Sequence, residues 1–258
     1  MKKPARIEFE YDNIKSYVVD DLAIIKISCN AFSTISNLDD ANKILPWFEA
    51  VEQDDSLKGV LAISEKDCLG EEAYEKFLSD ITGRDISKEG NKEITKFEKS
   101  EVRAIEINTL VNLIRKVLQF KKIFIAAING EIVTPFFGIN LASDFRLGSE
   151  DMRILFSHIK YGIHPSGILP LMLPKYLNRQ LATKYLLQGG EILGDKAVEL
   201  NLVNEILPAD NFEERCVQKS KEYLSCGINF IKSTKLLLNR NMKEFEEYVQ
   251  IEANYTYK

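Results

Sequence analysis

The residues best suited to acid–base chemistry are the two histidines, His158 and His164, which share the segment SHIKYGIHPSG. Histidine titrates near neutral pH, so it can accept and release a proton during a reaction. His158 is therefore a candidate catalytic proton shuttle, and a hydrogen-bonded histidine of the core or surface is the alternative. His164 precedes Pro165 and Ser166, a pattern typical of a loop turn.

A second candidate lies at Thr134-Pro135, a pair typical of a helix start. Threonine caps helix N-termini, and proline is welcome in the first turn because its missing N–H has no helical partner there. The next amides, those of Phe136 and Phe137, would point out of the positive end of the helix dipole. They could attract an oxygen that is gaining negative charge.

The four cysteines, Cys29, Cys68, Cys216 and Cys226, contain no CxxC pair, and no histidine stands at ligand spacing. The sequence therefore predicts neither a zinc site nor a disulfide framework, and reduced thiols suit a cytoplasmic protein. Cys68 has no histidine beside it in sequence, which favours a small buried residue over a nucleophile.

Composition narrows the classes of partner. The 258 residues carry a net charge of −5, so no global positive field exists to hold nucleic acid or an anionic membrane. A small polyanion needs only two or three local cationic side chains, which an acidic protein can still supply. No apolar h-region follows the N-terminal lysines and no apolar run could span a bilayer, so we expect neither a signal peptide nor a membrane helix.

The apolar periodicity predicts alternating strands and helices, and therefore an α/β fold in which helices cover the sheets. Residues 70–100 are polar and charged, which predicts a loosely packed stretch, either a solvated surface loop or a charged lid. The predicted elements are a hairpin over 17–29, strands at 57–64 and 123–128, and helices at 39–53, 102–120, 136–147, 181–187, 195–200, 212–224 and 230–255.

Residues 120–208 carry three motifs in a distinctive order. AAINGE is followed sixteen residues later by ASDFRLGSED, then by IKYGIHPSG, and last by LLQGGEILGDKAVELNLVNEILP. In this order and spacing, the chain resembles the crotonase (enoyl-CoA hydratase/isomerase) superfamily. The first 60 residues fit the same plan more loosely.

The resemblance implies a crotonase-like spiral of ββα units over residues 1–205 and a C-terminal helical oligomerisation region over 206–258. It implies a homotrimer or hexamer that takes an acyl-CoA or carrier-protein thioester as substrate, with no metal and no further cofactor. In such a fold two backbone N–H groups hold the thioester oxygen in an oxyanion hole. The residues implied are Leu69 at the first turn, Thr134, Pro135, Phe136 and Gly138 at the second, and Lys235 against the CoA phosphates, with Asp144 holding the structure.

Two departures from the family pattern bear on activity. Pro135 aligns with the second donor and has no N–H to give, so the oxyanion hole is either modified or lost. The family's two catalytic glutamates align with Gly138, which has no side chain to position water, and with His158. Glu131 lies nearby, but a solvated carboxylate is its simpler interpretation.

Two hypotheses about function follow. The chain is an enzyme whose enolate chemistry, such as isomerisation, decarboxylation or a hydration-like lyase reaction, proceeds with His158 as the proton shuttle. Alternatively, it is a non-catalytic binding or assembly subunit, which Pro135 and Gly138 favour.

Overall fold

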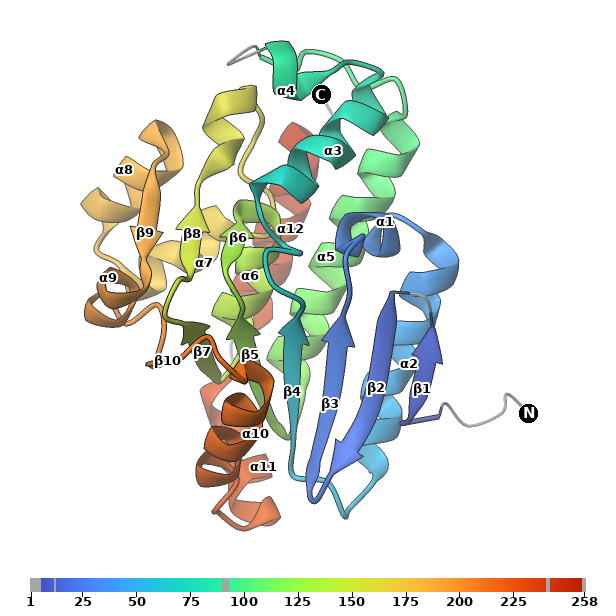
Figure 1. The fold of residues 1–258 in the computed structure, drawn as a ribbon, viewed down its shortest axis with the longest axis vertical. Coiled ribbons are helices and arrows are strands. Elements are labelled where there is room, and N and C mark those ends of the chain that lie inside the picture. The colour runs from blue at the N-terminus through green and yellow to red at the C-terminus, as the bar shows by residue number, and fades with distance from the viewer. Residues whose placement is uncertain (1–5, 12, 90–92, 240–241, 257–258) are drawn as a thin grey trace.

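A computed structural model describes residues 6–11, 13–89, 93–239 and 242–256, and its largest element is a seven-stranded sheet (Figure 1). The predicted hairpin is confirmed, because its two strands pair antiparallel and Val19 faces Leu22 across Asp20-Asp21. From the second of these strands onward all neighbours run parallel. In sheet order the strands are β1 (Phe9–Tyr11), β2 (Ile14–Val19), β3 (Leu22–Ile27), β4 (Gly59–Ser64), β5 (Ile123–Ile128), β7 (Phe145–Ser149) and β10 (Glu205–Leu207).

The central strands are buried on both faces, as parallel strands under two layers of helices must be. In β5 every residue is buried. Because side chains alternate along a strand, Ile123 and Ile125 enter one hydrophobic cluster while Phe124 and Ile128 enter the other. The predicted strands over 57–64 and 123–128 are both confirmed, and so is the α/β class.

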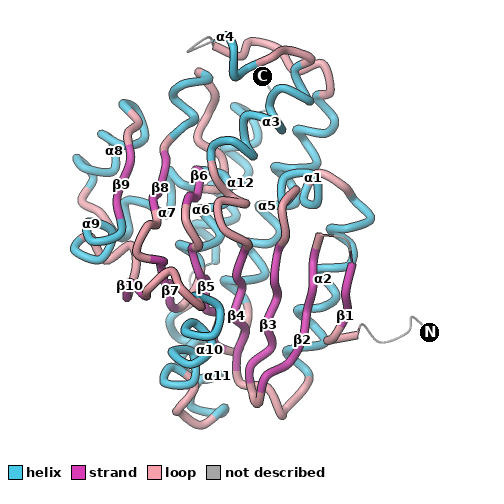
Figure 2. The backbone as a smooth tube through the Cα atoms, viewed as in Figure 1, coloured by secondary structure: helices cyan, strands magenta, loops and turns pink. Residues whose placement is uncertain are grey.

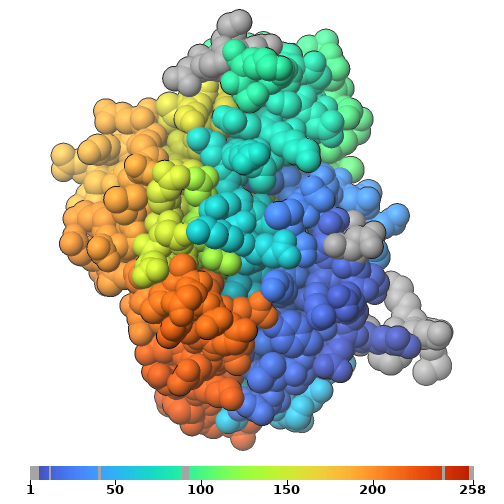
Figure 3. All heavy atoms as spheres, viewed as in Figure 1, coloured from blue at the N-terminus to red at the C-terminus, as the bar shows by residue number. Residues whose placement is uncertain are grey.

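Helices from different parts of the chain cover the two faces. On the Phe124 face lie α1 (Ala31–Ile35), α2 (Leu38–Gln53) and α5 (Ser100–Gln119). On the Ile125 face lie α10 (Phe212–Tyr223) and α11 (Ile228–Leu238). Figure 3 shows the N-terminal strands and α10 meeting at the surface, where Lys26 pairs with Glu213 at 2.6 Å.

A small second sheet extends the fold away from the hairpin (Figure 2). It consists of β6 (Glu131–Val133), β8 (Arg153–Leu155) and β9 (Glu191–Leu193). Around it lie α6 (Thr134–Ala142), the 3-10 helix η1 (Ser157–Tyr161), α7 (Leu169–Tyr176), α8 (Arg179–Gln188) and α9 (Gly194–Glu199). The motifs on which the family resemblance rests lie in this part and in the adjoining strands β5, β7 and β10 of the large sheet.

The prediction of a loosely packed stretch over 70–100 is wrong for its first half. Residues Glu71–Thr82 form helix α3, and a short helix α4 (Ile86–Glu89) follows. Tyr74, Leu78 and Ile81 are buried, so the charged residues cover only the outer face of an amphipathic helix. Residues 90–92 of the same stretch lie outside the described residues.

Two further predictions need correction. The helix expected over 136–147 ends at Ala142, because Ser143 and Asp144 break it and β7 begins at Phe145. The tail forms two helices, α11 and α12 (Met242–Thr256), and residues 240–241 between them lie outside the described residues.

The remaining predictions concern the domain boundary, membrane-spanning helices and the N-terminal segment. The predicted domain boundary between residues 205 and 206 falls inside β10 and stays a prediction. Within the described ranges, no helix is both long and apolar enough to cross a bilayer. Residues 1–5, part of the segment expected to lack signal-peptide character, are outside those ranges.

Candidate functional site

An apolar cavity of about 90 Å³ lies between the seven-stranded sheet and the helices on its Phe124 face. Its walls come from β2, β3, β4 and β5 and from α1, α2, α5 and α6, and its polar side chains are Thr34, Ser64 and Asn140. A single water needs roughly 10–15 Å³ with several polar partners, so this space suits a short hydrocarbon group better than ordered water. The cavity is therefore a candidate acyl-binding site.

The two turns singled out in the sequence meet at this cavity, since Leu69 and Phe136 both line it. Leu69 follows β4, and its carbonyl accepts the Val133 N–H at 2.9 Å, which forms a parallel bridge between Leu69 and Ile132. That bridge fixes the loop after β4 beside the strand that leads into α6. The fold thus brings together residues 67 positions apart, although the predicted use of the Leu69 amide stays a prediction.

Helix α6 starts one residue earlier than expected, because Val133 rather than Thr134 is its N-cap. Thr134 is fully buried, and its hydroxyl has no hydrogen-bond partner among the described residues. Pro135 lies in the first turn, as predicted, where no N–H is needed. Phe136 is the next residue, and helix geometry leaves its N–H without a partner inside the helix.

Gly138 stands on α6 against the backbone of the loop before α7. A Cβ built at Gly138 would lie 1.7 Å from the carbonyl oxygen of Gly167. Gly167 itself has φ of +76°, and a Cβ built there would lie 2.4 Å from the Pro135 carbonyl oxygen. No side chain fits at position 138 unless this loop moves.

His158 lies in the core and not in the cavity wall. Its side chain belongs to η1, the residue is 1% exposed, and Nε2 lies 2.9 Å from the carbonyl oxygen of Leu186 in α8. Burial lowers its pKa below the ordinary value, so the neutral ring is favoured. His158 is not among the residues that line the cavity, and its role as a proton shuttle stays a prediction.

His164, which the sequence assigns to a loop turn, lies in the loop after η1. Its Nδ1 is buried without a partner among the described residues. Burial lowers its pKa, and the nearby charges of His158 and Arg103 lower it further. The ring therefore sits in a poorly solvated place where its charged form is disfavoured.

Lys235 occupies an internal ion pair. Its Nζ lies 2.6 Å from Asp144 Oδ2 and 2.7 Å from the Lys122 carbonyl oxygen, and the residue is 5% exposed. Burial lowers the Lys235 pKa, which the Asp144 carboxylate opposes. The same carboxylate accepts the Phe124 N–H at 2.7 Å, so this pair ties α11 to β5. The predicted contact of Lys235 with a CoA phosphate stays a prediction.

Glu131 is also engaged. Its carboxylate pairs with Arg153 and accepts the Glu71 N–H at 3.2 Å, at the first turn of α3. A carboxylate at that end of a helix is stabilised by the helix dipole. The interpretation of Glu131 as an unengaged, solvated group therefore needs correction.

Comparisons with known proteins agree with this architecture. The family model described as enoyl-CoA hydratase/isomerase matches residues 81–258. An enoyl-CoA hydratase from Bacillus halodurans has a TM-score of 0.75 at 18% identity, with 95% of this chain and 94% of that one covered. An enoyl-CoA hydratase from Mycobacterium avium subsp. paratuberculosis K-10 has a TM-score of 0.71 at 19% identity, with 95% and 89% covered.

Curated relatives match a smaller part of much longer proteins. The fatty acid oxidation complex subunit alpha of Pseudomonas putida (strain GB-1) is 25% identical over 181 residues, 70% of this chain and 23% of that protein. Testis-specific chromodomain protein Y 2 of Homo sapiens is 22% identical over 137 residues, 53% of this chain and 25% of that protein. The chain thus spans about a quarter of the length of these relatives.

The chain belongs to the enoyl-CoA hydratase/isomerase family, because the family model covers well over half of it. The predicted crotonase superfamily and its fold are therefore confirmed. Sequence reasoning missed most of the cavity wall, notably Ile35 of α1 and Phe48 of α2. Their amphipathic helices signalled burial, but nothing in the sequence signalled that a space would remain between them.

Proposed function

We propose that this chain binds the acyl part of a CoA or carrier-tethered thioester and does not hydrate it by paired carboxylates. The observation that carries the proposal is the apolar cavity walled by Leu69 and Phe136, where the loop after β4 meets the start of α6. An apolar space beside a helix N-terminus suits a molecule with a hydrocarbon tail and a polarised carbonyl.

The residues at positions 138 and 158 support a protein that binds a thioester without hydrating it. In the register that the family resemblance gives, Gly138 and His158 stand where hydratases carry glutamates. The Gly167 carbonyl fills the space in which a side chain at 138 would stand, and His158 is turned into the core. Neither position can supply a carboxylate that holds and deprotonates a water molecule.

Calorimetric titration with free CoA and with acyl-CoA of increasing chain length tests the proposal. Each buried methylene is worth about 0.8 kcal/mol, so affinity should rise about fourfold per carbon until the cavity is full. Ala62→Leu adds bulk to the cavity wall and should remove this gain, whereas Ala253→Leu on the exposed face of α12 should not. Equal affinities for CoA and acyl-CoA would refute acyl binding.

A second candidate is thioester chemistry that needs only an oxyanion donor, such as isomerisation or decarboxylation. The specific observation in its favour is the Phe136 N–H, which has no partner within α6 and belongs to a residue of the cavity wall. If the thioester oxygen instead lies beside the backbone nitrogen of residue 135, Pro135→Ala supplies a new N–H donor at that position. Since losing one such donor costs about 100-fold or more in rate, Pro135→Ala should then raise turnover by up to about 100-fold.

Assays with enoyl-, β-keto- and malonyl-type thioesters separate the two candidates. Turnover that survives His158→Ala supports oxyanion chemistry without that imidazole. Tight binding with no turnover in either the wild type or Pro135→Ala supports the binding protein.

The proposal includes self-association as a homotrimer or hexamer in the cytoplasm. It is supported by the exposed leucines at the end of α11, Leu236, Leu237 and Leu238, which are 71–74% exposed in the single chain. Contiguous apolar side chains of this kind mark surfaces that pack against another chain. No metal takes part in the proposed thioester binding.

A further inference from the structure

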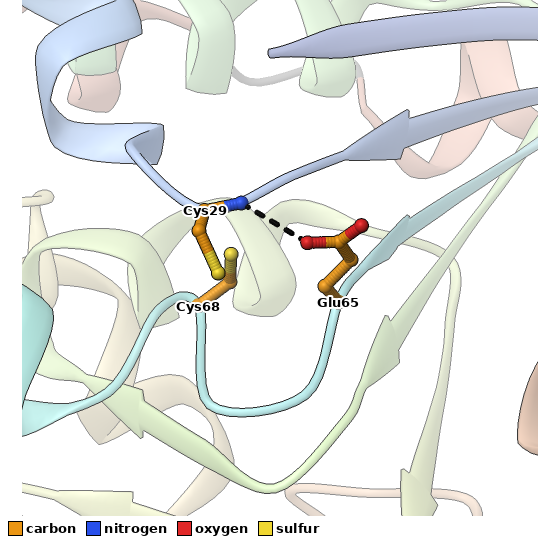
Figure 4. Close-up of side chains that lie close together, drawn as sticks. All are labelled: Cys29, Glu65 and Cys68. Carbon is orange, nitrogen blue, oxygen red and sulfur yellow. Dashed lines mark hydrogen bonds between the residues drawn. The ribbon is translucent and has the colours of Figure 1, made fainter.

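The loops after β3 and β4 bring three potential metal ligands together at the edge of the fold (Figure 4). Cys29 follows β3, and Glu65 and Cys68 lie on the loop after β4. One ligand atom from each, two sulfurs and a carboxylate oxygen, lie within 4.8 Å of one another. The cysteine spacing predicts no zinc site, because Cys29 is 36 residues from Glu65 and no CxxC pair is present. Only the fold brings these three side chains together.

The backbone holds these ligands in place. The Glu65 N–H donates to the Ile27 carbonyl at 2.9 Å, which continues the β3–β4 pairing to the loop. The Cys68 N–H donates to the Glu65 carbonyl at 3.2 Å, closing a turn that places both side chains on one side. The Cys29 N–H donates to the Glu65 carboxylate at 3.3 Å. Three hydrogen bonds donated by backbone N–H groups thus hold Cys29, Glu65 and Cys68 near one another.

We infer that Cys29, Glu65 and Cys68 form a binding site for a zinc-like divalent cation, with the fourth position open to solvent or to a small ligand. Two thiolates and one carboxylate are a donor set that Zn²⁺ accepts in tetrahedral geometry. Zn–S bonds of about 2.3 Å require a sulfur–sulfur separation of about 3.8 Å, so side-chain shifts of about 1 Å suffice. On binding, each thiol releases its proton to solvent, because the thiolate is the form that ligates the metal.

The surroundings fit a cation that enters from solvent. Cys29 is exposed and Cys68 is 2% exposed, and both line a surface cleft of about 700 Å³. The same cleft is lined by two lysines, Lys66 and Lys76, and by a larger number of acidic side chains, so its net charge is negative and attracts cations. The acidic residues are Asp67, Glu71, Glu72, Glu75, Asp80 and Glu131.

This site does not depend on acyl binding, because the acyl cavity is lined by Leu69 of the same loop and by Ser64 of β4 but by none of the three ligands. Failure of one proposal therefore leaves the other standing. The two can be separated by measuring acyl-CoA affinity and metal affinity on the same variants.

Cobalt titration of the whole, reduced and chelator-stripped protein tests the inference, since thiolate–Co²⁺ bonds give a charge-transfer absorption in the near ultraviolet. One Co²⁺ per chain should bind with this band, and Zn²⁺ should displace it. Cys29→Ser should weaken Co²⁺ binding by about 100-fold, since even lost outer-shell partners cost 10- to 100-fold. Cys226→Ser removes an exposed cysteine on the loop between α10 and α11 and is the matched control, with unchanged binding expected.

Glu65→Gln is the second variant, useful if Cys29→Ser alters the fold as judged by circular dichroism. It keeps the size of the side chain and removes its charge, so Co²⁺ binding should weaken while the charge-transfer band remains. The inference is overturned if the wild type shows no thiolate band, or if Cys29→Ser or Glu65→Gln binds Co²⁺ as tightly as the wild type. It is also overturned if the protein, incubated in air with Co²⁺, retains no metal and mass spectrometry shows only the loss of two hydrogens, which dissolved oxygen accepts as Cys29 and Cys68 form a disulfide.

Discussion

At the scale of single residues, the contact between Gly138 and Gly167 defines what this site can hold. The two glycines let the backbone of α6 and the loop before α7 approach more closely than any side chain permits. The position that the resemblance links to catalysis is therefore filled by main chain. A substitution at position 138 alone therefore cannot place a side chain there, because the Gly167 carbonyl occupies the space.

Gly138→Ala should destabilise the protein by about 1–3 kcal/mol, the usual cost of forcing an extra methyl into a packed place. The added Cβ meets a backbone oxygen, which cannot rotate away as a side chain could. Urea denaturation measures the loss. Gly227→Ala is the control, because a Cβ there meets no atom within 4 Å, and it should change stability by less than about 0.5 kcal/mol. Equal stabilities of the two variants would contradict the packing described.

Lys235→Met should cost about 3 kcal/mol of unfolding free energy, because it leaves the Asp144 carboxylate without its ammonium partner. Lys232→Met, on the same helix, breaks an exposed pair with Asp55 and should cost no more than about 1 kcal/mol. Thermal or urea unfolding compares the two. If Lys235 instead serves a CoA phosphate, Lys235→Met will keep its stability and lose CoA affinity.

Residue types alone predicted part of this site. Pro135 at a helix start and Gly138 as a position without a side chain could be read directly, because each follows from the residue's own covalent structure. The burial of His158 could not, because its Nε2 partner lies 28 residues further along the chain. The ion pair of Lys235 could not be predicted for the same reason, since its partner Asp144 lies 91 residues away in the sequence.

At the scale of elements, His158 links η1 to α8 through the Leu186 carbonyl. Burial lowers the pKa of both His158 and His164 below 6.5. The unfolded chain therefore binds more protons than the folded one below that pH. The stability that these groups contribute is present above about pH 6.5 and is lost as pH falls through the folded-state pKa values.

His158→Gln removes one of these titrations and should make the urea midpoint depend less steeply on pH between about pH 8 and pH 5. His164→Gln should act in the same direction, because the pKa of this half-buried ring is also lowered. Wild-type and variant unfolding curves across this range provide the measurement. Identical pH slopes for wild type and both variants would show that neither ring controls acid stability.

Long elements were predictable and short ones were not. The 20-residue α5 and the six-residue strands β4 and β5 have clear apolar periods, so they appeared where expected. Strands β6, β8 and β9 are three residues each, too short for any period to develop. Helix α3 was missed because its exposed face is densely charged and masks the buried Tyr74, Leu78 and Ile81.

At the scale of the whole molecule, the exposed leucines of α11 and Phe230 on the same helix leave apolar surface for another chain. Leu237→Glu should shift the protein from oligomer to monomer, because a charge in a buried interface is strongly unfavourable. Sedimentation velocity measures the change. Leu187→Glu replaces an equally exposed leucine on α8 and serves as the comparison. A wild type that sediments as a monomer would contradict the proposed assembly.

The close approach of α6 to the loop before α7 also limits what engineering can do with this scaffold. A carboxylate at position 138 cannot be introduced by one substitution, because residues 165–168 must first be redesigned to vacate the place that Gly167 now fills. Loop redesign would have to precede any change of side chain. Mutational routes toward hydratase activity therefore cross intermediates that are less stable than the starting protein, and random single-site libraries should not reach it.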